Sequence, residues 1–95
     1  MITGICKLEM MLFEIHSLKE KRMIIKSIIG RLQAKFNISV SEVGYQDQWG
    51  RSEIGISCVS TNTKHANQML DKIIDFVEKD GRVEIIHQET EYIGS

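Results

Sequence analysis

The stretch His16–Arg22 concentrates the residues most able to take part in chemistry. Ser17 and Glu20 have the S-x-x-E spacing of a capping box, in which a hydroxyl and a carboxylate accept from free backbone N–H groups at a helix start. The next turns are rich in cations, although an exposed, unpaired cation near the positive end of a helix dipole costs about 0.3–1 kcal/mol. Cations beside free N–H groups favour phosphate binding. We therefore predict an anion-binding or RNA-binding surface formed by Lys19, Lys21, Arg22 and Lys26. The alternative is a solvated helix face whose cations pair with nearby carboxylates of the protein.

A second group of chemically active side chains lies between two predicted strands, in the segment 45–51. It combines two aromatic residues with an arginine, residue types that are enriched at the hot spots of protein interfaces. Two hypotheses remain open for the indole, which either contacts a partner or folds back and closes the end of the core. The interface candidates are Tyr45, Trp49 and Arg51.

Catalytic and metal-binding patterns are not found in the sequence. The three histidines fall in different segments, and there is no C-x-x-C or H-x₃₋₅-H spacing for a metal site. His16 beside Ser17 resembles a base and nucleophile only superficially, because Ser17 is better used as a helix cap. Cys6 and Cys58 are expected to be buried and inert on neighbouring strands. We predict a non-enzymatic protein without a metal or cofactor.

Composition and charge set the broad class. With 95 residues, 42% hydrophobic and 26% charged, the chain has the composition of one globular domain spanning residues 1–95. The N-terminal segment lacks the pattern of a signal peptide or membrane span, and two distant cysteines do not form a disulfide framework, so we expect a cytoplasmic protein. Residues 17–36 carry six cations against one carboxylate, although the whole chain has a net charge of −1. Such asymmetry suits docking to one anionic surface.

The elements that position these residues follow from hydrophobic periodicity. Alternating residues predict strands, with the alternation blurred over residues 10–13 by a bulge or a covered second face. Apolar residues at helical spacing predict two amphipathic helices, the second capped within residues 61–63. The expected order is a strand at 2–15, a helix at 18–36, strands at 38–43 and 53–60, a helix ending near 80–81 and a strand at 82–93. This βαββαβ order predicts an α+β, ferredoxin-like sandwich, with a four-stranded antiparallel sheet and two helices on one face.

Two functions are compatible with this fold. An RNA-recognition motif has the same topology but needs aromatic side chains on its central strands, and the third predicted strand, 53–60, has none. We therefore expect contacts to the RNA backbone, in free RNA or in a ribosomal particle, rather than base reading across the sheet. The alternative is a homodimeric regulatory module that pairs through the open sheet face or an edge strand, with Tyr45 and Trp49 near the contact.

Several segments resemble the YlxP-like family of small bacterial proteins over essentially the whole chain. The similar segments are Ser17–Arg22, Phe36–Gly44, Asp47–Trp49 and Ile54–Ile56, and Gly50 departs from the larger polar residue expected there. The resemblance implies a ferredoxin-like fold and a bacterial cytoplasmic protein. Because members are often encoded beside genes for translation initiation and ribosome maturation, it also suggests a role near the ribosome. It implies no activity, cofactor or catalytic residue.

Overall fold

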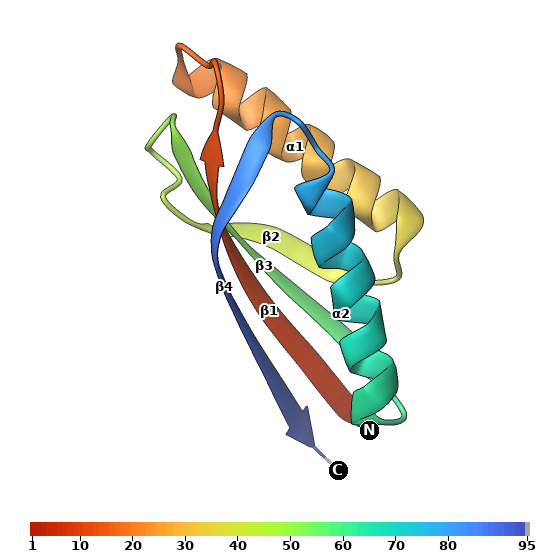
Figure 1. The fold of residues 1–95 in the computed structure, drawn as a ribbon. Coiled ribbons are helices and arrows are strands. Elements are labelled where there is room, and N and C mark those ends of the chain that lie inside the picture. Colours follow the sequence, from red (N-terminus) through yellow and green to blue (C-terminus); the bar gives the residue numbers. More distant parts are fainter. Residues whose placement is uncertain (95) are drawn as a thin grey trace.

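The computed structural model describes residues 1–94, which form four strands and two helices in the order βαββαβ (Figure 1). Both helices pack on one face of an open antiparallel sheet, and the molecule is elongated, with extents of 44 × 21 × 18 Å. The predicted ferredoxin-like α+β fold is confirmed. The elements are β1 (Ile2–Leu12), α1 (Leu18–Lys35), β2 (Ser39–Gly44), β3 (Arg51–Ser60), α2 (Thr63–Glu78) and β4 (Val83–Gly94).

The sheet has the strand order β2-β3-β1-β4, which places β1 and β3 at its centre. The β1–β3 register is regular from Ile2↔Ser60 to Met11↔Arg51. Two irregularities occur at the edges: the β1–β4 register shifts between Glu9 and Met10, and the β2–β3 register shifts between Glu42 and Gly44. The bulge expected near residues 10–13 is thus present at Glu9/Met10, where β4 supplies the extra residue.

Strict alternation explains how β1 and β3 form the core. Even-numbered residues of β1 from Ile2 to Leu12 are buried, and the even-numbered residues of β3 from Ser52 to Cys58 are buried beside them. The odd-numbered residues of both strands lie on the opposite, open face, because side chains alternate across a pleated strand. Cys6 and Cys58 both lie in this core as free, buried thiols, as predicted.

The two helices cover the core with side chains at helical spacing. In α1 the side chain of Ser17 accepts a hydrogen bond from the Glu20 backbone N–H at 3.1 Å, which is the predicted cap. In α2 the side chain of Asn62 accepts from the His65 backbone N–H at 2.8 Å in the same way. The buried positions of α2 are Ala66, Leu70, Ile73 and Val77. Neither helix of the described residues has the length and apolar character needed to cross a membrane.

Candidate functional site

The exposed side of α1 carries three of the four predicted anion-binding residues. Lys19, Arg22 and Lys26 are all exposed, and none of them forms an ion pair with a carboxylate within residues 1–94. Their spacing of three and four residues aligns them along the helix. This side of the helix therefore presents uncompensated positive charge to solvent. We call these three residues the outer cations.

The prediction for Lys21 needs correction, because its side chain is completely buried. Its Nζ lies 3.1 Å from Oε2 of Glu42 and donates a hydrogen bond to the carbonyl oxygen of Tyr45. The Ser52 hydroxyl donates to the same Glu42 oxygen at 2.6 Å. A buried ammonium that is already bound by two protein oxygens cannot bind an external phosphate. The anion-binding hypothesis is therefore restricted to the outer cations.

The sequence contains the signal that would have identified Lys21 as a buried residue. Positions 21, 25, 28 and 32 have helical spacing, and the other three members of this series are buried Ile or Leu residues. Glu42 follows Val40 by two residues in β2, so both side chains point toward the helices. An inward-facing lysine and an inward-facing glutamate on facing elements predict a buried ion pair.

The structure brings Tyr45 and Arg51 together on the open face of the sheet. The Tyr45 hydroxyl donates to Oε1 of Glu9 at 3.1 Å, and Nη2 of Arg51 lies 2.5 Å from Oε2 of the same carboxylate. The guanidinium carbon of Arg51 is 4.6 Å from the centroid of the Tyr45 ring. Hydrogen bonding from Arg51, and then from Tyr45, lowers the pKa of Glu9, so this carboxylate stays ionised.

The third interface candidate, Trp49, does not join this network and retains 48% of its surface exposed. The chain beside it is fixed, since the Leu12 N–H donates to the carbonyl of Gly50 at 3.1 Å and the Gln48 N–H donates to that of Tyr45 at 3.0 Å. About half of the Trp49 surface is covered by the protein and about half stays in water. The indole remains accessible on an anchored loop.

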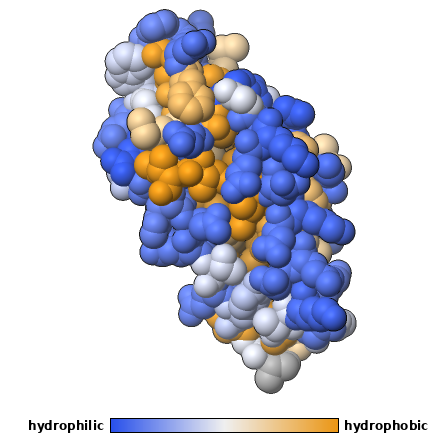
Figure 2. Space-filling view, in the orientation of Figure 1, coloured by the Kyte–Doolittle hydropathy of each residue, from blue (hydrophilic) through white to orange (hydrophobic). Residues whose placement is uncertain are grey.

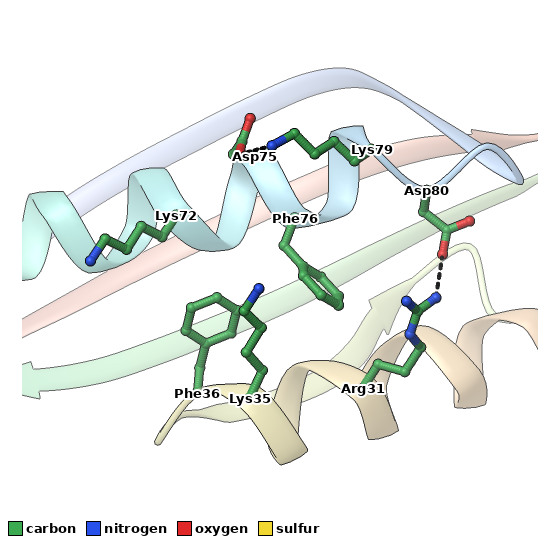
Figure 3. Close-up of a pocket in the computed structure, with 8 residues that line it drawn as sticks. All are labelled: Arg31, Lys35, Phe36, Lys72, Asp75, Phe76, Lys79 and Asp80. Atoms are coloured by element: carbon green, nitrogen blue, oxygen red, sulfur yellow. Dashed lines mark ion pairs between the residues drawn. The ribbon is translucent and has the colours of Figure 1, made fainter.

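A cleft of about 340 Å³ lies between the C-terminal parts of α1 and α2 (Figure 3). The rings of Phe36 and Phe76 meet edge to face, with centroids 6.0 Å apart, and Nζ of Lys35 lies 4.9 Å from the Phe76 centroid. Two ion pairs also line the cleft: Arg31 with Asp80, at 3.8 Å, and Lys79 with Asp75, at 2.8 Å. Since the two half-buried rings pack on each other and four of the six charged side chains that line the cleft are in ion pairs, we assign the cleft to the packing of the two helices.

Neither cysteine is activated for chemistry. Burial raises the pKa of both the Cys6 and the Cys58 thiols, which disfavours the reactive thiolate. Within residues 1–94, no three His, Cys, Asp or Glu side chains are grouped as a metal site would require.

Comparisons with known proteins support the fold and indicate the family. The designed protein Foldit4 has a similar structure, with a TM-score of 0.51 and 13% identity over 98% of both chains, which is a likeness of fold alone. The uncharacterized protein YlxP of Bacillus subtilis (strain 168) is 37% identical over 89 residues, covering 94% of this chain and 97% of that protein. The model of the family described as protein of unknown function DUF503 matches residues 3–90. The predicted resemblance to YlxP-like proteins is confirmed, and the chain belongs to the DUF503 family.

Proposed function

We propose that this protein binds RNA, free or within a ribosomal particle, through the outer cations of α1. The observation that carries the proposal is the division of charge on the first turns of the helix. Lys21 is buried and paired with Glu42, while Lys19, Arg22 and Lys26 are exposed and have no ion-pair partner within residues 1–94. All three cations attract an external anion by their own charge, and at Lys19, in the first turn of α1, the helix dipole favours the anion as well.

Contact with phosphates has a measurable thermodynamic signature. Each cation that neutralises a phosphate releases counterions, so the logarithm of the affinity falls with the logarithm of salt concentration, with a slope of about 0.7–0.9 per contact. Three outer cations then predict a slope of about 2–3 for this surface. Phosphate contacts position a protein on RNA without reading its sequence, so weak dependence on base sequence is expected.

The test combines two charge reversals with a matched control. We expect Lys19→Glu with Arg22→Glu to abolish co-sedimentation with ribosomal particles and binding to structured RNA at low salt. The control is Lys64→Glu with Lys72→Glu, which changes net charge equally on exposed residues of α2. Both variants should keep the thermal stability of the wild type. Unchanged RNA binding in the α1 variant, or equal losses in both variants, would overturn the proposal.

A homodimeric interaction module remains the second candidate. The half-exposed Trp49 in the loop between β2 and β3 is the observation that favours it. Tyr45 contributes less than expected, because its hydroxyl is bound to Glu9 and its ring is covered by Arg51. Size-exclusion chromatography with light scattering on the wild type and on Trp49→Ala distinguishes the two functions: a stable dimer that depends on Trp49 and ignores RNA would favour this second candidate.

A further inference from the structure

Apolar side chains gather at the end of the sheet where β1 ends and β4 begins. Backbone hydrogen bonds hold the three contributing segments together, from the Leu12 N–H to the Gly50 carbonyl at 3.1 Å and from the Phe13 N–H to the Arg82 carbonyl at 3.0 Å. Figure 2 shows hydrophobic surface at this end of the molecule, bordered by hydrophilic residues. We define the sheet-end patch as Met11, Phe13, Trp49 and Ile86, which are 39–48% exposed.

The internal packing of the fold does not require large apolar residues at these positions. Met11 continues the odd-numbered series of β1, whose other members include Thr3, Lys7 and Glu9 on the open face. Burying a side chain of this size stabilises a protein by about 1.5–3 kcal/mol, and much of that gain is missing when half of its surface stays in water. Contiguous exposed apolar surface rimmed by polar residues is typical of a binding site.

Three carboxylates lie beside the residues of the sheet-end patch. Glu84 lies directly opposite Met11 in the β1–β4 register, Glu14 follows Phe13, and Asp47 precedes Trp49 by two residues. None of these three carboxylates forms an ion pair within the described residues 1–94. The nearest cation on β3, Arg51, is already bound to Glu9. The patch therefore offers apolar contact next to three carboxylates that have no ion-pair partner within residues 1–94.

We propose that the sheet-end patch docks a lysine- and arginine-rich segment of a protein partner. An apolar side chain of that segment packs against Phe13 and Trp49, and its cations face Glu14, Asp47 and Glu84. Charge complementarity selects this partner, because like-charged surfaces repel and an RNA backbone would meet these carboxylates. The residues of this site differ from the outer cations of α1, which form the proposed RNA-binding surface.

The experiment selects short random peptides displayed on phage against the whole protein. We expect enriched peptides to combine several Lys or Arg residues with an aromatic or leucine anchor. Synthetic versions should change the fluorescence of Trp49, which is the only tryptophan in the chain. Trp49→Ala should weaken their binding by about 10-fold or more, as for a hot-spot aromatic residue. No RNA is present, so this test is separate from that of the proposed function.

Matched variants at the far end of the same face distinguish docking at the patch from nonspecific electrostatic or hydrophobic binding. Glu84→Lys should weaken peptide binding strongly, whereas Glu91→Lys, on the same strand and opposite Ile5, should not. Phe13→Ser should weaken binding, whereas Val59→Ser, exposed at the other end of β3, should not. The proposal is overturned if no peptide is enriched, if enriched peptides are acidic, if the controls lose binding equally, or if the wild type is a dimer that Trp49→Ala dissociates.

Discussion

The inner and outer sides of the first turns of α1 carry the same kind of side chain in opposite environments. Lys21, on the inner side, is completely buried and bound by Glu42 and the Tyr45 carbonyl. Lys19 and Arg22, one or two residues away, are exposed and unpaired within residues 1–94. A rotation of about 100° per residue therefore separates a cation that organises the fold from cations available to a partner.

This difference teaches that a basic segment is not a uniform surface. The inner polar contacts of α1 should determine stability, and its outer charges should determine binding with little effect on stability. Ser27 extends the inner set, because its hydroxyl accepts from Arg82 at 3.3 Å, and Arg82 is held by Asp80 at 2.7 Å. Four substitutions compare the inner polar contacts with exposed positions of α1. They are ordered from the largest expected change in stability to the smallest.

The largest loss of stability is expected for Lys21→Met. The substitution leaves the mostly buried Glu42 without its cation, and removing one partner of a buried ion pair costs about 3–5 kcal/mol. Because Glu42 is partly exposed, we expect about 3 kcal/mol. Chemical denaturation measures this change. Lys21→Met combined with Glu42→Leu should recover much of the loss, and equal stability of Lys21→Met and wild type would contradict a structural role.

A smaller loss, of about 2 kcal/mol, is expected for Asp80→Asn, since the change weakens charge-assisted hydrogen bonds to Arg82. Hydrogen bonding from Arg82 lowers the pKa of Asp80 below its ordinary value of 3.8. A lowered folded-state pKa means that the ionised carboxylate stabilises the protein above that ordinary value and that this stabilisation is lost as pH falls through the folded-state pKa. The difference between Asp80→Asn and wild type should therefore shrink in acid. Thermal unfolding between neutral and acidic pH measures it, with Asp71→Asn as the exposed control.

A gain in stability of about 0.5–1 kcal/mol is expected for Gly30→Ala. Gly30 lies in the interior of α1 on its exposed side, and a Cβ built there would meet no atom within 4 Å. Alanine has the higher helix propensity and creates no clash. Thermal unfolding would show the rise in melting temperature, and a decrease would reveal an internal constraint at this position.

The smallest change in stability, within about 0.5 kcal/mol, is expected for Lys26→Ala, because an exposed side chain without an ion pair contributes little to folding. The same variant should lose about one phosphate contact, so the slope of log affinity against log salt concentration should fall by about 0.7–0.9. A large loss of stability would place Lys26 among the inner contacts. An unchanged salt dependence would remove it from the binding surface.

Hydrophobic periodicity predicted the fold well, because the central strands bury every second residue and each helix buries residues three or four positions apart. The alternation of β1 and β3 and the apolar spacing of both helices identified the sheet and its covered face. The burial of Lys21 was missed since charged residues were assigned to the surface by type, although helical spacing places Lys21 with Ile25 and Ile28. The exposure of Trp49 could not be predicted, because it depends on a loop whose geometry is fixed by contacts to Leu12 and other distant residues.

Tyr45 has a left-handed backbone, with φ of 57°, and its carbonyl is bound by a lysine that lies 24 positions earlier in the chain. Such a conformation costs about 1–3 kcal/mol in a residue other than glycine, so it needs support from its surroundings. We therefore expect the turn after β2 to keep this shape only while the first turns of α1 are packed against it. In the native protein, the amide protons of both segments should exchange with solvent through one shared opening event.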